Sequence, residues 1–311
     1  TLKSPEDAKE ILKALVDVQR VTIVGGGYIG LEMLEALLEL RKEVRLIQRP
    51  ERLLPKYDRE FTDLLEEELK EKVTLHFKES VEGFEGKEKV EQIVTEKGTY
   101  ETEAVILAVG YKPVTEIFKD ELELLEDGSI KTDEAFETSV KDVYAIGDCA
   151  VKRNAITGEY QNIKLGTMAN RQGKYLAYYL SGKREAFPGI LGTNMIKVLD
   201  WEMAATGLSE DDARKHYEVE TAFIKSSLKP GYMPVEKEDN IIYAKMIIDK
   251  ESKRILGGQL MGKESSALKI QSLAVAIQKQ MNTHELEFLD LGYHPHVQGL
   301  WDLWQTLAGI F

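Results

Sequence analysis

The sequence VTIVGGGYIGLE, residues 21–32, joins a short β-branched run to three glycines and then to a helical pattern. A Gly-x-Gly-x-x-Gly string between a predicted strand and a predicted helix indicates a dinucleotide-binding fold. Gly25 permits the tight turn, Gly27 lets the backbone approach a pyrophosphate, and Gly30 lets the helix pack on the strand. The helix start then faces the phosphate charge. A glycine turn without a ligand is the alternative, and the strand and helix context favours dinucleotide binding.

The residue that usually contacts the ribose lies about 20 positions further on, at the end of the second strand. Gln48 occupies that place here, and Arg49 follows it. A carboxylate there would repel the 2′-phosphate that distinguishes NADPH from NADH, whereas neutral Gln48 beside Arg49 could accept this phosphate. Arg49 could equally be a solvated surface charge, so the choice between NADH and NADPH stays open.

The residues around this Gly-x-Gly-x-x-Gly string, the dinucleotide-binding fingerprint, predict a parallel α/β layer. Strands buried on both faces read as continuous apolar runs, and the helices between them carry apolar residues at helical spacing. The pattern predicts helices over residues 4–19, 29–40 and 58–71 and strands over 21–24, 44–47 and 73–77. Strands and helices that alternate with short links form one mononucleotide-binding half of a Rossmann-type fold.

A second α/β segment follows this half. Residues 81–103 predict a small antiparallel insertion, which leads to an apolar strand at 104–109. A strand-like run at 143–146 then precedes a helix at 166–180.

The last third of the chain has a different pattern. We expect strands at residues 194–199, 217–224, 241–248 and 255–260, and then a helix at 267–280. Strands followed by a helix are typical of a separate α+β domain. The chain is therefore expected to divide into residues 1–112, 113–187 and 188–311.

Composition excludes several classes of protein. The chain has 311 residues and a net charge of -13, and its basic residues are scattered among acidic ones, so no nucleic-acid partner is expected. The longest apolar runs are far shorter than the roughly 20 residues of a membrane helix, and the polar start lacks a signal-peptide pattern. The single cysteine, Cys149, excludes a disulfide framework and fits a reducing compartment. We expect a cytoplasmic protein without a membrane span.

Three linked motifs carry a resemblance to a known family. The fingerprint string, AVGYKP at residues 108–113 and TSVKDVYAIGDC at residues 138–149 follow one another at characteristic spacing. Together they resemble the pyridine nucleotide-disulfide oxidoreductases, above all the single-cysteine branch of coenzyme A-disulfide reductases, NADH oxidases and NADH peroxidases. Over nearly the whole chain, the resemblance implies an NAD(P)-binding domain, the C-terminal part of an FAD-binding domain and a dimerisation domain. It also implies NAD(P)H and FAD as cofactors.

The resemblance implies roles for three residues near the nicotinamide. Tyr28 matches an aromatic side chain that lies over the flavin and moves aside for nicotinamide. Glu32 matches an acid near the nicotinamide end, and Gly110 matches a glycine that passes under the pyridine nucleotide. Tyr28 taken alone could be core packing.

The resemblance also implies a flavin site. Asp148 matches the acid that binds the ribityl and phosphate region of FAD, and Gly147 permits its close approach. The helix after Gly166, whose first turn includes Ala169, resembles the one whose N-terminus points at the flavin pyrimidine, where its positive end stabilises a reduced ring. Asp148 taken alone could be a helix cap.

The last domain resembles the dimerisation domain of this branch and implies a homodimer. Tyr232 and Tyr293 match loop tyrosines directed toward the partner's active site, where they could hydrogen-bond a leaving thiolate or a peroxide. An aromatic that fixes a turn is the alternative interpretation of each. His294 and His296 are separated by one residue, but further ligands are not evident in the sequence, so we predict no metal site.

The whole-enzyme mechanism implied by the family passes hydride from NAD(P)H to FAD and then electrons to a small-molecule disulfide, peroxide or oxygen. Cys149 is expected to be a small buried residue. The family's redox cysteine lies in an N-terminal flavin segment that would precede this sequence, so we expect the chain to be inactive alone. Two alternatives remain: a non-flavin NAD(P)-dependent dehydrogenase, and a non-catalytic nucleotide-binding and dimerising fragment that needs a separate N-terminal part.

Overall fold

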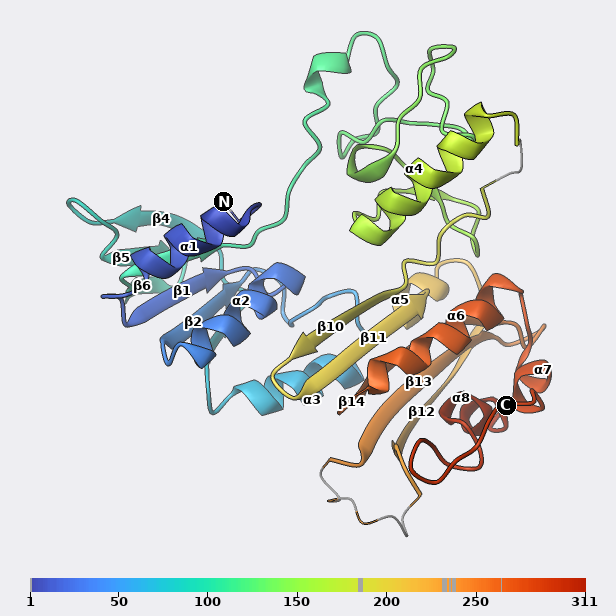
Figure 1. The fold of residues 1–311 in the computed structure, drawn as a ribbon. Helices are drawn as coiled ribbons and strands as arrows, with labels where there is room; N and C mark the ends of the chain where they lie inside the picture. Colours follow the sequence, from blue (N-terminus) through green and yellow to red (C-terminus); the bar gives the residue numbers. More distant parts are fainter. Residues whose placement is uncertain (1, 184–186, 231–233, 235, 237–238, 264) are drawn as a thin grey trace. The chain divides into compact units, whose positions relative to one another are not determined.

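A computed structural model describes residues 2–183, 187–230, 234, 236, 239–263 and 265–311 (Figure 1). The chain divides into two compact units, residues 1–110 with 196–201, and residues 111–195 with 202–311. The α/β class predicted from the sequence is confirmed, while the division into three domains stays a prediction.

The first unit is built on a parallel sheet with the strand order β3-β2-β1-β7. Its strands are β1 (Arg20–Val24), β2 (Glu43–Gln48), β3 (Thr74–Phe77) and β7 (Ala104–Leu107). Val24 pairs with Ile47 on one side and with Leu107 on the other, so the carboxyl ends of these strands meet at one edge. Ligands of open parallel sheets bind at that edge.

The helices of this unit are α1 (Pro5–Ala14), α2 (Tyr28–Glu39) and α3 (Arg59–Leu69), and Figure 1 shows α2 lying along β1 and β2. Apolar residues at helical spacing face the interior, as the sequence predicts. The fully buried ones are Leu31, Leu34 and Leu37 on α2 and Phe61, Leu65 and Leu69 on α3.

The first helix is shorter than predicted. It begins with the expected Ser4 cap and Pro5 in its first turn, but it ends at Ala14 and not at residue 19. The Lys42 ammonium donates to the carbonyl oxygens of Leu15 and Val18, at 2.8 and 2.6 Å, and so stabilises the end of this segment. A distant lysine therefore fixes a boundary that local periodicity cannot reveal.

The predicted antiparallel insertion is present. It consists of β4 (Val81–Glu85), β5 (Gln92–Thr95) and β6 (Gly98–Glu101), in the order β4-β5-β6. It leads directly into β7, whose backbone continues the parallel sheet.

The second unit begins with mostly irregular chain. Its elements are η1 (Glu116–Phe118), η2 (Gly147–Cys149), β8 (Lys152–Arg153), β9 (Tyr160–Gln161) and α4 (Gly166–Leu180). The strand expected at residues 143–146 is wrong, because in the described part of the chain Tyr144 alone forms a β-bridge there, an isolated one with Glu137. Asp142 has a φ of 63°, so a turn precedes this run and limits its pairing.

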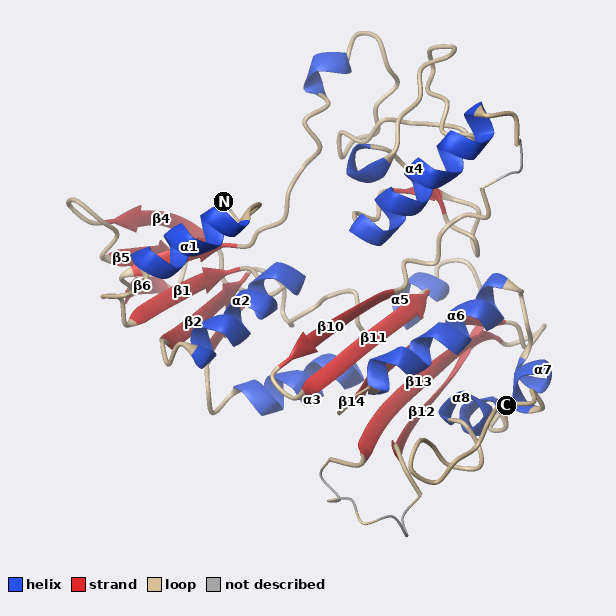
Figure 2. Cartoon of the chain, in the orientation of Figure 1, coloured by secondary structure: helices blue, strands red, loops and turns tan. Residues whose placement is uncertain are grey.

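An antiparallel sheet and its helices complete the second unit. Strands β11 (Trp201–Gly207), β14 (Ile255–Gly262), β13 (Ile241–Asp249) and β12 (Val219–Ser227) are neighbours in that order. β10 (Asn194–Val198) precedes them in the chain. Figure 2 shows α6 (Ile270–Gln278) lying along this sheet. The remaining helices are α5 (Glu210–Ala213), η3 (Ser266–Lys269), α7 (Thr283–Glu287) and α8 (Leu303–Ala308).

Candidate functional site

The glycine turn lies at the carboxyl end of β1, and two of its glycines leave no room for a side chain. Gly25 has a φ of 106°, and a Cβ there would lie 2.4 Å from the Ala108 carbonyl oxygen. A Cβ on Gly30 would lie 1.9 Å from the Gly25 carbonyl oxygen, so a larger residue forces the start of α2 away from the turn. Gly27 differs, because a Cβ there would have no heavy atom of a described residue within 4 Å. The turn is therefore tight on its inner side and open at Gly27.

Gln48 is part of the turn and not a free surface group. Its side chain is 4% exposed, its Oε1 accepts from the Gly26 N–H, and its Nε2 donates to the Arg52 carbonyl oxygen. Arg49 is exposed, and none of the described residues forms an ion pair with it. Gln48 thus supports the loop, while Arg49 remains available to a ligand at the same edge.

Tyr28 lies half-buried at the first position of α2. Burial raises its pKa to about 12, against the opposing effect of a hydrogen bond with Tyr57. Tyr57 is 1% exposed and was not identified from the sequence, because a lone aromatic in a loop gives no signal. Both phenols stay protonated at neutral pH, so Tyr28 meets a ligand as a neutral group.

Glu32 and Gly110 take different places around the same sheet. Glu32 lies exposed on α2, one turn beyond Tyr28. Gly110 follows β7 and has a φ of 81°, and no described residue lies within 4 Å of the place where its Cβ would be. The first unit therefore gathers the predicted nucleotide residues around the carboxyl ends of β1, β2 and β7.

The second unit holds a turn of another kind. In η2, Gly147 has a φ of 79°, and a Cβ there would lie 3.7 Å from the Ala169 Cβ. Asp148 Oδ2 accepts from the Tyr111 hydroxyl at 2.8 Å. Asp148 Oδ1 is buried and has no hydrogen-bond partner among the described residues. The structure thus brings Gly147, Asp148 and Ala169 together and leaves one carboxylate oxygen for a donor.

Buried polar side chains position this turn, and sequence reasoning missed them. Lys152 is 2% exposed, and its ammonium donates to the Gly147 carbonyl oxygen at 2.6 Å and to Asn162 Oδ1 at 3.0 Å. Burial lowers the pKa of Lys152 to about 8, although nearby Asp148 raises it. Gln172 Oε1 accepts from the Gly147 N–H at 2.9 Å. These polar residues can be recognised as supports of the turn only when the structure shows that they are buried.

Cys149 has the surroundings of a structural residue. Its thiol donates to the Ile146 carbonyl oxygen at 3.3 Å and packs beside the buried Ile130 and Ala150. Cys149 is half-buried and not fully buried as expected, but a thiol held in this way favours a packing role.

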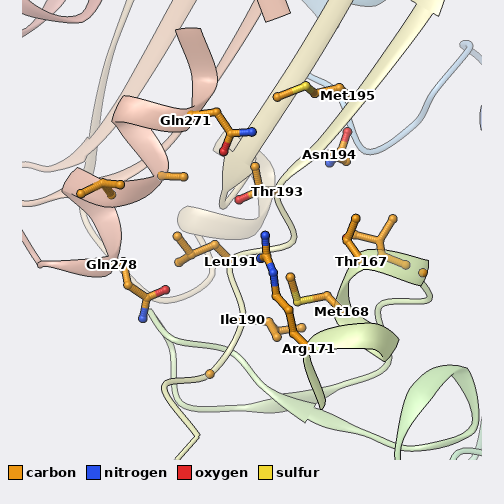
Figure 3. Close-up of a pocket in the computed structure, with 15 residues that line it drawn as sticks. Thr167, Met168, Arg171, Ile190, Leu191, Thr193, Asn194, Met195, Gln271 and Gln278 are labelled. Atoms are coloured by element: carbon orange, nitrogen blue, oxygen red, sulfur yellow. The ribbon is translucent and has the colours of Figure 1, made fainter. Parts of the chain in front are cut away.

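A cavity that the sequence does not predict lies in the second unit and has a volume of about 520 Å³. Figure 3 shows Thr167, Met168 and Arg171 of α4 on one side of it. Gln271 and Gln278 of α6 line the opposite side. Because Met168 directly precedes Ala169, the cavity borders the start of α4.

The predicted catalytic tyrosines are only partly described. Tyr232 lies outside the described residues. Tyr293 is 46% exposed, in the loop before α8. The rings of His294 and His296 stack with centroids 5.6 Å apart, and the described residues contain no metal-ligand group of three or more acidic, His or Cys side chains. In the described part of the chain, no helix has the length and apolar character to cross a membrane.

Residues 1–173 match the family described as pyridine nucleotide-disulphide oxidoreductase, and residues 193–302 match its dimerisation domain. The chain is 41% identical to the NAD(P)H sulfur oxidoreductase (CoA-dependent) of Pyrococcus abyssi, over 100% of this chain and 70% of that protein. The water-forming NADH oxidase of Lactobacillus brevis, bound to NADH, superposes with a TM-score of 0.92 at 28% identity, over 99% of this chain and 68% of that one. An engineered form of that enzyme, a water-forming NADPH oxidase bound to NADPH, gives a TM-score of 0.93 at 28% identity, over 99% and 69%.

Proposed function

This chain belongs to the pyridine nucleotide-disulphide oxidoreductase family, and we propose that its two glycine turns hold NAD(P)H and FAD. The family and the named relatives identify an FAD-dependent NAD(P)H oxidoreductase of the disulfide-reductase type. Matches to both family regions count against a non-flavin dehydrogenase. A non-catalytic protein that binds nucleotide and dimerises remains the alternative.

The observation that carries nucleotide binding is the geometry of the first turn. No side chain in the described ranges caps the backbone N–H groups at the start of α2, and none lies in the space at Gly27. A pyrophosphate can therefore approach these N–H groups, and the positive end of the helix stabilises its charge. We propose that Gly25, Gly27 and Gly30 shape this cradle, with Tyr28, Glu32 and Gly110 toward the nicotinamide end.

The second turn fits FAD. A ribityl hydroxyl can donate to the unpartnered Asp148 Oδ1, and Gly147 presents no side chain against such a ligand. We propose that Ala169, in the first turn of α4, lies near the flavin ring, where the helix N-terminus favours negative charge. FAD, when bound, supplies a ring that accepts hydride and passes electrons on. Lys152, Asn162 and Gln172 hold the turn in place for it.

NADPH is proposed to bind at least as well as NADH. The engineered NADPH oxidase carries an Asp-to-Ala exchange followed directly by an Ala-to-Arg exchange, 18 and 19 residues after an exchanged glycine. We align that glycine with Gly30, the last glycine of the turn motif. The same spacing then leads to Gln48 and Arg49 in this chain, and the proline exchanged in that enzyme falls on Pro55. The neutral and basic pair that accompanies NADPH there is thus already present here.

For the acceptor, we propose a small molecule with a sulfur–sulfur bond. The 41% identical relative is a CoA-dependent sulfur oxidoreductase, whereas relatives named as NADH oxidases are 32–34% identical and the solved NADH oxidase is 28% identical. Oxygen is the second candidate because the fold of the solved water-forming NADH oxidase matches at a TM-score of 0.92. In a homodimer formed through the C-terminal domain, Tyr293 and Tyr232 would donate hydrogen bonds to the leaving thiolate.

A test starts from the 311-residue protein of verified mass. We expect it to bind NAD(P)H, and to bind FAD more tightly than an Asp148→Leu variant does, as measured by ligand fluorescence. We expect no reduction of coenzyme A disulfide by this chain alone, since its one thiol is held by the Ile146 carbonyl. Robust turnover that persists in Cys149→Ser would show that the proposed electron path is wrong.

A further inference from the structure

A group of basic side chains lies just beyond the carboxyl ends of β2 and β3, in a chain whose net charge is -13. Arg49 and Arg52 follow β2, Lys78 follows β3, and Arg59 begins α3. Glu51 lies among them. We call these five residues the ribose-edge cluster.

Glu51 joins two of these cations. Its Oε1 lies 2.5 Å from the Arg59 guanidinium, and its Oε2 lies 2.9 Å from the Lys78 ammonium. The side chains of Glu51, Arg59 and Lys78 are 47%, 58% and 68% exposed. The hydrogen bond from Lys78 and the charges of Lys78 and Arg59 lower the pKa of Glu51, so it is an anion at neutral pH.

Backbone hydrogen bonds attach this cluster to the nucleotide turn. The Lys78 N–H donates to the Pro50 carbonyl oxygen at 3.1 Å, which fixes the end of β3 beside the end of β2. Gln48 bonds to Gly26, and the Leu54 N–H donates to the Gly26 carbonyl oxygen at 3.0 Å. The loop that carries Glu51 is therefore tied to the glycine turn from both of its ends.

We propose that Glu51 is an internal anion that holds Arg59 and Lys78 at the ribose edge, and that the 2′-phosphate of NADPH takes its place. The inference rests on the proposed binding of NAD(P)H at the glycine turn. NADH has no such phosphate and leaves both ion pairs of Glu51 intact. Arg59 and Lys78 are then specificity-determining residues in addition to Arg49.

Replacement of the Glu51 carboxylate by the 2′-phosphate of NADPH is favourable, because the two anions differ in charge and in the number of acceptor oxygens. Exposed ion pairs stabilise a protein little, so opening the Glu51 pairs costs little. A ribose phosphate carries up to two negative charges and three acceptor oxygens, and a guanidinium can bind it with two parallel hydrogen bonds. The same cations that a single carboxylate occupies can therefore bind a phosphate more strongly.

Calorimetric titration of the full 311-residue chain with 5′-AMP and 2′,5′-ADP tests this, because these probes are the adenosine ends of NADH and NADPH. We expect Glu51→Gln to bind 2′,5′-ADP about threefold more tightly, since the competing anion is gone. Lys78→Met should bind it about fivefold more weakly. Binding of 5′-AMP should change less than twofold in both variants.

Glu116→Gln and Lys119→Met are matched controls. These residues form another exposed ion pair, at 2.7 Å, so the substitutions change net charge in the same way.

Two outcomes would overturn the inference but not the proposed function. In one, the control variants change the affinity for 2′,5′-ADP as much as the cluster variants do. In the other, the cluster variants leave that affinity unchanged while 5′-AMP still binds. Tighter binding of 3′,5′-ADP than of 2′,5′-ADP by the parent would also overturn it, because the cluster would then bind a coenzyme A-type phosphate. If neither 5′-AMP nor NADPH binds, the proposed function fails together with the inference.

Discussion

The two glycine turns of this chain are built in opposite ways. Between β1 and α2, the chain completes its own turn, because the Gln48 amide bonds to the Gly26 N–H and the Arg52 carbonyl oxygen. In η2, by contrast, Asp148 Oδ1 and Gln172 Nε2 are buried without a hydrogen-bond partner in the described part of the chain. The buried Gln48 side chain of the first turn is therefore paired without a ligand, whereas two buried side-chain atoms at the second turn are not.

This difference separates two modes of recognition. A turn whose supporting side chain is already paired still offers backbone N–H groups and open space, so a ligand binds to a preformed cradle. A buried polar atom without a partner costs about 1–3 kcal/mol, which a ligand with a matching hydroxyl can recover. We therefore expect substitutions in the first turn to act through sterics, and those around the second to act through polar and charged groups.

The largest effect is expected for Gly25→Val. The residue would need a φ of 106° and a Cβ 2.4 Å from the Ala108 carbonyl oxygen. Strain and overpacking together should lower the free energy of unfolding by about 3 kcal/mol. Chemical denaturation monitored by circular dichroism measures this. Gly27→Ala, where the Cβ meets open space, is the control and should be close to neutral. Equal losses in both variants would contradict the steric account.

Gly27→Val tests the cradle itself. Because a Cβ at Gly27 would have no described residue within 4 Å, the variant should fold, but its side chain would occupy the space of the pyrophosphate. The parent should gain about 2.7 kcal/mol of stability at a nucleotide concentration 100 times its dissociation constant, and the variant should gain none. Thermal unfolding with and without NADPH measures both. Equal stabilisation of the two proteins would show that the turn does not bind nucleotide.

The sequence predicted the first turn well because its determinants are local. Apolar runs and helical spacing located β1, α2 and β2 almost to the residue, and the glycines marked the turn between them. The run at 143–146 misled, because β-branched and aromatic residues favour strands whether or not a partner strand is present. Its true conformation depends on the turn at Asp142.

The polar contacts of both sites could not be predicted, because they depend on tertiary structure. The bond from Gln48 to Gly26 spans 22 residues, and the ion pair of Glu51 with Lys78 requires β3 to lie next to β2. Lys152 looks like a surface residue in the sequence, and only its exposure of 2% identifies it as a support of η2. Periodicity places side chains on faces but does not reveal their distant partners.

The polar character of the second turn predicts a pH effect at Lys152. Its pKa of about 8 lies below the usual value of 10.5, so between these pH values the unfolded chain binds a proton that the folded chain has released. Stability should therefore rise, by about 2 kcal/mol, as the pH increases from 8 to 10. Lys152→Met should lack this rise, whatever its stability at pH 7. Lys131→Met, which removes an exposed partner of Glu123, should keep it. Identical pH profiles for Lys152→Met and the parent would refute the assignment.

The smallest effect is expected for Gln48→Glu, which places charge in the turn that we regard as sterically determined. The new carboxylate can still accept from the Gly26 N–H, but it can no longer donate to the Arg52 carbonyl oxygen. Two unit charges 4 Å apart interact by roughly 4 kcal/mol near a protein surface, and solvent and nearby Arg49 reduce this for a ribose phosphate. We expect the ratio of NADPH to NADH affinity to fall about tenfold, which corresponds to about 1.4 kcal/mol of binding free energy.

Gln48→Met separates charge from loop support, because it removes both hydrogen bonds of the Gln48 amide without adding charge and should weaken both nucleotides equally. Fluorescence titrations with each nucleotide give the ratios. An unchanged ratio in Gln48→Glu would mean that position 48 supports the loop only, and that phosphate selection lies with Arg49, Arg59 and Lys78.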